Sequence, residues 1–497
     1  MSGPDVATFF SPGDFLAILP EMVIAGMACV ILMVDLVVPR TKRWVVPALS
    51  VLSVAAAAWF SWNLAGSGVS AFSGMFVLDG YAAFFKLIFY IVAVFAVFVS
   101  IRYIKTEEID LGEYYVLMLF SLSGMMIMAS GSDLLTIYLG LELASLPVYA
   151  LVGFLQKSRK SNEAAMKYVI LGAFSSAILL YGISLIYGLT GTTQLAAISA
   201  ALETGAVSGP LFTLAVIMLV AGFGFKVAGF PFHMWAPDAY EGAPTPITAF
   251  MAAGPKAAAF AVIMRVFLEG LFPAYDNWQM AIAAVAVGSM VVGNITAIMQ
   301  TSIKRMLAFS SVGHAGYALL GLVAGSEEGI ASVMFYLLVY AFMNLGIFGI
   351  IIMMRRDSQS GDQISHYAGL AKSNRLTALA MLVFLFSLAG IPPTAGFVAK
   401  FYVFMALIHK GMIGLAVVAA LMSAVAAYYY IRIVMLMYMR EPEKEFLLAS
   451  SRGILCVLII ALAAVVALGV YPLTYKPRPA RRSAVGQERN EMERWYP

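Results

Sequence analysis

The sequence predicts an all-α, polytopic membrane protein with about fourteen transmembrane helices. Three observations predict this class: an excess of apolar residues, their grouping into long stretches, and an alternation of charge between the loops that join those stretches. Of the 497 residues, 62% are hydrophobic and 12% are charged, whereas a soluble domain has about 25% charged residues. A soluble fold cannot hide so much apolar surface from water, so the composition indicates a chain embedded in lipid.

The apolar stretches give the helix count. A helix that spans a bilayer needs about 20 apolar residues. Windows of that length place the segments at 15–38, 44–66, 77–101, 114–131, 133–155, 164–189, 209–230, 244–270, 279–299, 303–324, 330–354, 376–404, 411–439 and 453–472.

The loops between these segments predict the orientation of the chain. All odd-numbered loops except the seventh are basic, with Arg40, Lys42, Arg43, Arg102, Lys105, Lys157, Arg159, Lys160, Lys304, Arg305, Arg355, Arg356, Lys372, Arg375, Arg440, Lys444 and Arg452. The even-numbered loops carry mainly acids, with Lys410 as the exception. The positive-inside rule therefore places the basic loops in the cytoplasm and both termini in the periplasm. The basic tail from Lys476 onward departs from this rule and is expected to be a polar, disordered appendage.

Two apolar segments contain prolines that should break a helix. The seventh ends in Gly229-Phe230-Pro231, and the twelfth contains Pro392 and Pro393. A proline removes a backbone hydrogen bond, which a membrane tolerates only where protein or a water-filled cavity satisfies the freed groups. Paired breaks in two halves of a chain indicate an inverted repeat with an ion pathway between the halves. Two ordinary proline kinks are the alternative.

Ionisable residues inside the apolar segments are the main functional signal. They are Glu142, Lys226, Lys256, His314 and Lys400. Inserting one formal charge at the centre of a bilayer costs about 2.5–3.5 kcal/mol. These side chains are therefore expected to face one another, or water, inside the bundle.

Lysine suits proton transfer in such a place. Burial favours the neutral form of a lysine, and a nearby carboxylate favours the charged form. A Glu–Lys pair that opens and closes can therefore release and take up a proton. Several lysines in a row, linked by histidine, hydroxyl groups and water, would make a proton relay.

Each candidate also has a structural interpretation. Glu142 could belong to a static ion pair, Lys226 and Lys400 could hold carbonyl groups freed by the helix breaks, and Lys256 could cap a helix beside Pro255. His314 and His233 could be merely hydrogen-bonded.

Lys167 and the charges near helix ends are less certain members of this set. Lys167 could pair with Glu163 four residues earlier on a helix surface or with Glu142, and we favour Glu142. The residues nearer helix ends are expected to be interfacial, with Lys86 reaching toward the membrane surface; they are Glu21, Asp35, Asp79, Lys86 and Arg265.

The sequence carries no sign of a redox centre, a metal site or a nucleotide site. Cys29 and Cys456 form no CxxC pair, the four histidines lack metal-ligand spacing, and neither a GxGxxG unit after a strand nor a Walker loop is present. Energy for transport is therefore expected to come from another subunit.

Several motifs resemble one known family. The tract from Pro231 to Pro246, reading PFHMWAPDAYEGAPTP, closely resembles the hallmark of the antiporter-like membrane subunits of respiratory complex I, the NADH:quinone oxidoreductase. Leu141–Pro147, Lys304–Ser311 and Gly390–Phe397 also resemble motifs of that family.

The resemblance implies a fold and a division of the chain. It implies fourteen helices with two inverted five-helix repeats and broken helices 7 and 12. Residues 1–113 would form three N-terminal helices, 114–272 the first repeat (helices 4–8), 273–440 the second repeat (helices 9–13), and 441–475 helix 14, before the polar tail 476–497.

The resemblance also implies roles for the charged residues. Glu142 of the fifth helix would pair with Lys226 of broken helix 7, Lys256 would be the central lysine, and Lys400 the lysine of broken helix 12. His233 and Lys167 match further relay positions.

A function follows from the resemblance, with three alternatives. The chain would translocate protons in a bacterial inner membrane, without cofactors of its own, while partner subunits hold NADH, FMN, iron–sulfur clusters and quinone. Its partners would be other subunits of the complex, including neighbouring antiporter-like subunits, and the lipid bilayer. The alternatives are a stand-alone cation/proton antiporter, a secondary transporter of a small solute, and a purely structural membrane subunit.

Overall fold

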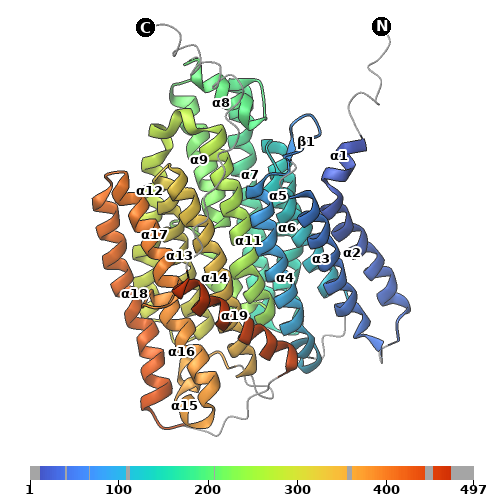
Figure 1. Cartoon of the computed structure of the whole chain (residues 1–497), viewed down its shortest axis with the longest axis vertical. Helices are drawn as coiled ribbons and strands as arrows, with labels where there is room; N and C mark the ends of the chain where they lie inside the picture. The colour runs from blue at the N-terminus through green and yellow to red at the C-terminus, as the bar shows by residue number, and fades with distance from the viewer. Residues whose placement is uncertain are drawn as a thin grey trace.

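The chain forms a bundle of long helices (Figure 1). The computed structural model describes residues 12–39, 42–65, 68–107, 112–205, 207–354, 361–442 and 451–471. Its helices are α1 (Pro12–Ala17), α2 (Leu19–Val37), α3 (Val45–Leu64), α4 (Gly80–Thr106), α5 (Glu113–Ser130), α6 (Leu134–Val152), α7 (Arg159–Thr190), α8 (Leu195–Glu203), α9 (Pro210–Lys226), α10 (Trp235–Gly242), α11 (Thr245–Arg265), α12 (Tyr275–Ile298), α13 (Ile303–Val323), α14 (Glu327–Met353), α15 (Leu370–Ser373), α16 (Arg375–Ala389), α17 (Ala395–His409), α18 (Ile413–Met439) and α19 (Arg452–Val470).

The predicted class, an all-α membrane protein, is confirmed. Twelve of the described helices are long and apolar enough to cross a membrane. The seventh predicted segment holds the shorter α9, and the twelfth holds α16 and α17 in place of one continuous helix. In the described part of the chain, strands are limited to the short antiparallel pair β1 (Ser70–Ala71) and β2 (Phe76–Val77).

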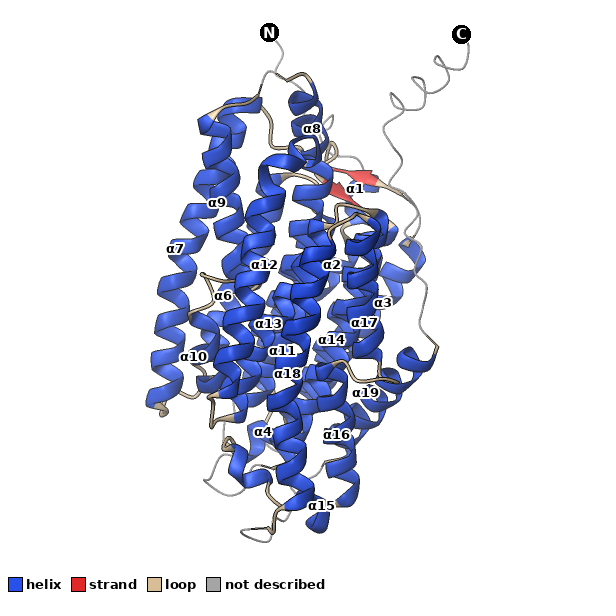
Figure 2. Ribbon diagram, turned by 90° about the vertical axis from the view of Figure 1, so that its left-hand side faces the viewer, coloured by secondary structure: helices blue, strands red, loops and turns tan. Residues whose placement is uncertain are grey.

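The short elements gather at opposite ends of the bundle. The strand pair, α1 and α8 lie at one end, whereas α15 lies at the other (Figures 1 and 2). The strands and α8 belong to the second and sixth predicted loops, and α15 belongs to the eleventh. Loops that were predicted to lie on opposite sides of the membrane therefore lie at opposite ends of the helix bundle.

The interior of the bundle is formed by α11, α13 and α14, in which almost every residue is buried. The peripheral helices instead expose large apolar side chains, such as Leu36 and Val37 of α2 and Ile459 of α19. An outer surface of this kind suits a lipid environment.

Glycines allow two helix pairs to pack very closely. A Cβ atom on Gly124 of α5 would lie 2.2 Å from the backbone nitrogen of Ala144 in α6. A Cβ atom on Gly293 of α12 would lie 2.6 Å from the backbone nitrogen of Gly313 in α13. Small residues let membrane helices approach in this way.

One expectation about the first helices is wrong. Lys86 does not extend toward the membrane surface: its side chain is 1% exposed and that of Glu21 is 2% exposed, and the Lys86 ammonium lies 2.6 Å from the Glu21 carboxylate. Hydropathy read in windows of about 20 residues could not reveal this pair, because Glu21 and Lys86 lie on two helices that are far apart in sequence. Arg40, Arg355, Arg356, Lys444 and the tail 476–497 lie outside the described residues.

Candidate functional site

Lys226 lies where α9 stops. The chain leaves the helix after Lys226, passes Pro231, and resumes as α10 at Trp235. Lys226 Nζ lies 3.9 Å from Glu142 Oε1 of α6, so the structure brings these two predicted residues together. Glu142 is 23% exposed in the isolated chain.

Hydroxyl groups surround this ion pair. Lys226 Nζ donates to Ser145 Oγ at 3.2 Å, to Ser176 Oγ at 3.4 Å and to Tyr149 Oη at 3.5 Å. Ser176 in turn donates to Glu142 Oε1 at 2.5 Å. The carboxylate and the ammonium are therefore linked both directly and through the Ser176 hydroxyl.

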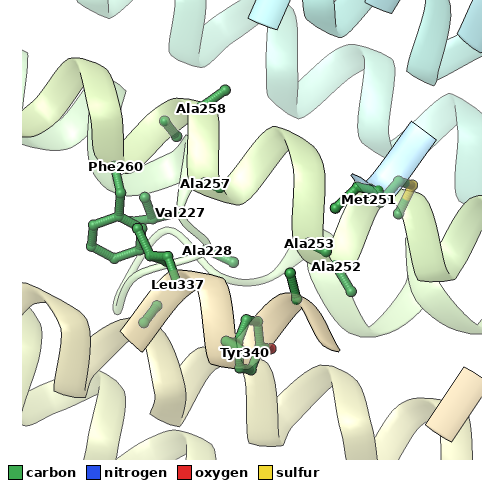
Figure 3. Close-up of a cluster of buried hydrophobic side chains, with 14 of the residues drawn as sticks. Val227, Ala228, Met251, Ala252, Ala253, Ala257, Ala258, Phe260, Leu337 and Tyr340 are labelled. Carbon is green, nitrogen blue, oxygen red and sulfur yellow. The ribbon is translucent and has the colours of Figure 1, made fainter. Parts of the chain in front are cut away.

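Apolar and aromatic side chains lie next to Lys226 and Lys256. Val227 and Ala228, which follow Lys226, belong to a cluster of buried hydrophobic side chains that includes Phe260 of α11 and Leu337 of α14 (Figure 3). A series of aromatic rings belongs to the same cluster and runs from Tyr149 to Tyr168 at 4.6 Å, Trp235 at 4.3 Å and Tyr240 at 6.4 Å. The Tyr240 ring then lies 5.9 Å from Lys256 Nζ.

Lys256 is held by α13. Its ammonium donates to the carbonyl oxygen of Ser311 at 2.9 Å and to the Ser311 hydroxyl at 2.8 Å. It therefore reaches across to another helix, whereas a cap would bind the ends of its own helix. A small cavity lies between Lys256 and His314, with Ser311, Tyr336 and Tyr340 among its lining residues.

His314 lies between two tyrosines. Its Nδ1 is 2.5 Å from the Tyr336 hydroxyl, and its Nε2 is 3.1 Å from the Tyr430 hydroxyl of α18. Tyr430 also hydrogen-bonds with Ser310. The Tyr317 ring, 6.1 Å from the His314 ring, lies 4.8 Å from Lys400 Nζ. Tyr317 thus contacts both His314 and Lys400.

Lys400 lies beside the second break. Pro392 and Pro393 separate α16 from α17. From α17, Lys400 Nζ donates to the carbonyl oxygens of Leu388 and Ala389 at 3.1 and 3.0 Å, and to Ser423 Oγ at 2.9 Å. These carbonyls belong to the last turn of α16, which lacks intrahelical donors. Lys400 therefore holds freed carbonyls, as its structural interpretation expects, and also contacts Tyr317.

Lys167 and His233 lie apart from the Glu142–Lys226 pair. Lys167 Nζ is 2.8 Å from both Glu163 and Asp238, so the favoured contact with Glu142 is not made. The buried His233 ring lies 5.9 Å from the Phe230 ring, and its Nδ1 has no hydrogen-bond partner among the described residues.

Sequence reasoning did not find the hydroxyl partners. The chain has 24 tyrosines, and residue type alone does not single out the ones near the lysines. Spacing offered one signal, because Ser145 and Tyr149 follow Glu142 by three and seven residues and so lie on the same face of a helix.

Arg265 is the last residue of α11, at a helix end as predicted. It is buried, donates to both Asp79 carboxylate oxygens at 2.8 and 2.9 Å, and reaches Glu269 at 3.0 Å. This cluster ties the start of α4 to the end of α11.

A helical membrane bundle with lysines beside two interrupted helices is the arrangement that the resemblance to antiporter-like membrane subunits implies. The family described as "NADH:quinone oxidoreductase/Mrp antiporter, TM" matches residues 131–419, and the chain belongs to this family. "NADH-quinone oxidoreductase subunit N 2" of Rhizobium meliloti (strain 1021) is 53% identical over 471 residues, which cover 95% of this chain and 98% of that protein. The subunit N of Trichlorobacter lovleyi is 45% identical over 443 residues, which cover 89% and 91%.

Solved structures show the same fold. A chain of respiratory complex I from Thermus thermophilus aligns with a TM-score of 0.78 at 33% identity, covering 91% of this chain and 97% of that one. A chain of the Mrp complex from Dietzia sp. aligns with a TM-score of 0.75 at 22% identity, covering 91% and 94%, which shows a shared fold alone.

Proposed function

We propose that this chain acts as subunit N of a bacterial proton-translocating NADH:quinone oxidoreductase and moves protons through a buried relay. Its family and its relatives, named as N subunits at up to 53% identity over nearly their whole length, support the role as a membrane subunit. They favour it over a stand-alone antiporter or a solute transporter. The relay is our own inference from the geometry.

The Glu142–Lys226 pair is the observation that carries the proposal. The two groups are 3.9 Å apart at a helix break and share the Ser176 hydroxyl. Separating them would remove the carboxylate that favours the charged lysine, so Lys226 would release a proton. Moving one charge against 100 mV costs about 2.3 kcal/mol, a scale that the loss of one desolvated charge partner can supply.

The second part of the relay would run through Lys256, His314 and Lys400. The Lys256–Ser311 bonds, the cavity beside His314 and the tyrosines at His314 provide groups that can pass a proton. The apolar stretch between Lys226 and Lys256 would transmit charge only when water enters it. A change at Lys226 would therefore control transfer to Lys256.

We further propose fourteen spanning helices in two inverted repeats, 114–272 and 273–440, after three N-terminal helices in 1–113, with helix 14 in 441–475. The corresponding close pairs, α5 with α6 and α12 with α13, each pack through glycine, and each half contains one interrupted helix. The basic loops would face the cytoplasm and both termini the periplasm.

Redox chemistry would occur in partner subunits. NADH, FMN, iron–sulfur clusters and quinone would bind there, and neighbouring antiporter-like subunits would contact this chain in the inner membrane. Energy would reach Glu142 and Lys226 as a conformational or electrostatic change.

Lys226→Ala tests the proposal. In the assembled complex, we expect NADH-driven proton pumping in membrane vesicles to fall about tenfold, which corresponds to a barrier higher by about 1.4 kcal/mol. Assembly is checked on a native gel, and Lys372→Ala, at an exposed surface ion pair with Glu441, is the matched control. Normal pumping by an assembled Lys226→Ala complex would refute the relay.

A further inference from the structure

A second group of charges surrounds α10, outside the line of Glu142, Lys226, Lys256, His314 and Lys400. α10 contributes Asp238 and Glu241. Asp238 lies 2.8 Å from Lys167 of α7 and 2.8 Å from Arg305 of α13. Glu241 lies 3.1 Å from Arg305 and 3.5 Å from Lys160 of α7. The group therefore connects α7, in the first half of the chain, with α13, in the second.

The two carboxylates that hold Lys167 differ in their surroundings. Glu163 is 59% exposed, belongs to the same helix as Lys167 and forms a surface i,i+4 pair, an arrangement worth little. Asp238 is 27% exposed. Its Oδ2 atom binds Lys167, and its Oδ1 atom accepts a hydrogen bond from Arg305. Charge-assisted bonds from two cations define the position of a carboxylate closely, so Asp238 is the partner that can place the Lys167 ammonium.

α10 also connects this group with the helix break. Trp235, at the start of α10, donates its Nε1 hydrogen to the carbonyl oxygen of Phe225 at 2.9 Å, directly before Lys226. The Trp235 ring stacks on Tyr168 at 4.3 Å, directly after Lys167. A shift of α10 would therefore move both Lys167 and the end of α9.

We propose that Asp238 is a positioning residue that holds the Lys167 ammonium next to Tyr168, whose ring lies 4.6 Å from that of Tyr149, a partner of Lys226, and that Arg305 holds Asp238 in place. The inference rests on the proposed function and extends its relay to Lys167, the position that the family resemblance implies. Through Arg305, the second half of the chain would govern proton loading in the first half.

Asp238→Asn is the first test, in the assembled complex. We expect proton pumping to fall about tenfold, and Asp238→Glu to restore most of it because the carboxylate returns. Glu163→Gln is the matched control: it removes the other carboxylate beside Lys167 and should leave pumping within about twofold of the parent, as expected for an exposed i,i+4 pair. Equal damage by both neutralising changes would overturn the assignment to Asp238.

A double-mutant cycle separates positioning from simple support of the fold. If Asp238 acts through Lys167, Asp238→Asn should cause no further loss in a Lys167→Met background. Fully additive losses would overturn the proposal, as would normal pumping by an assembled Asp238→Asn complex. If Asp238→Asn does not assemble, Arg305→Gln is measured instead, and normal pumping by that assembled variant would also overturn it.

The outcomes distinguish this inference from the proposed function. A strong loss in Lys226→Ala with normal pumping in Asp238→Asn would remove the role of Asp238 and leave the relay intact. Normal pumping in Lys226→Ala would refute both the relay and the role of Asp238.

Discussion

The buried lysines have different partners, and this difference determines what their removal should do. Lys226 has the Glu142 carboxylate, whereas Lys256 and Lys400 bind neutral oxygens: Ser311 for one, and Ser423 with two carbonyls for the other. Removing Lys226 leaves a charge without its partner. Removing Lys256 leaves only the neutral oxygens of Ser311 without a donor, so folding should be less affected.

A substitution at Lys400 can distinguish a role in helix capping from a role in proton transfer. Lys400→Met keeps the length of the side chain and leaves two carbonyls of α16 unsatisfied, at a cost of about 1–3 kcal/mol each. We expect a lower melting temperature, retained assembly, and pumping about tenfold slower at equal complex content. Thermal shift and vesicle pumping assays measure the two effects. Normal pumping would assign Lys400 to capping alone.

Charged residues of the relay could be predicted from sequence because a charge in an apolar segment is costly and needs a partner. That argument predicts that Glu142 and Lys226 lie close together. The hydroxyl groups of Ser176, Ser311 and Tyr430 could not be predicted, because serine and tyrosine enter apolar segments at little cost and their helices meet only in three dimensions.

At the scale of helices, the Glu21–Lys86 pair joins α2 to α4. Both side chains are almost fully buried, so removing one partner leaves an uncompensated charge, at a cost of about 3–5 kcal/mol. We expect Lys86→Met to lower thermal stability strongly, and the double variant Glu21→Gln, Lys86→Met to recover much of the loss. Equal destabilisation by the single and double variants, measured by thermal unfolding of the complex, would contradict this account.

The contact between α12 and α13 gives a prediction about packing. Gly293→Ala places a methyl group 2.6 Å from a backbone nitrogen, so the helices must separate, and overpacking costs about 1–3 kcal/mol. We expect reduced assembly on a native gel. Gly188→Ala in α7 is the control, because its added Cβ atom would have no neighbour within 4 Å. Equal assembly of the two variants would rule out the close contact.

Proline positions also indicated where two helices could end, since proline cannot continue a helix without losing a bond. The sequence did not indicate that residues 235–242 form a separate helix, α10. Its role as a link depends on contacts with α7 and α13, which lie far from it along the chain.

Over the whole molecule, the candidate relay crosses the bundle from helix to helix. It starts at α6, α7 and α9, passes α11 and α13, and reaches α17 and α18 (Figure 1). Hydropathy predicted the membrane class, because it reflects the lipid around the bundle, and the alternation of loop charge supported the helix count. Which helices form the buried interior could not be predicted, because α14 is as apolar as the peripheral helices.

In the proposed relay, protons pass between the two halves of the chain through Lys256. The most direct test is the rate of NADH-driven proton translocation by the purified complex carrying Lys256→Met in proteoliposomes, at matched complex content. We expect a rate about tenfold below that of the parent complex, with assembly retained because the partners of Lys256, Ser311 and the Tyr240 ring, carry no charge. An unchanged rate would contradict the proposed relay.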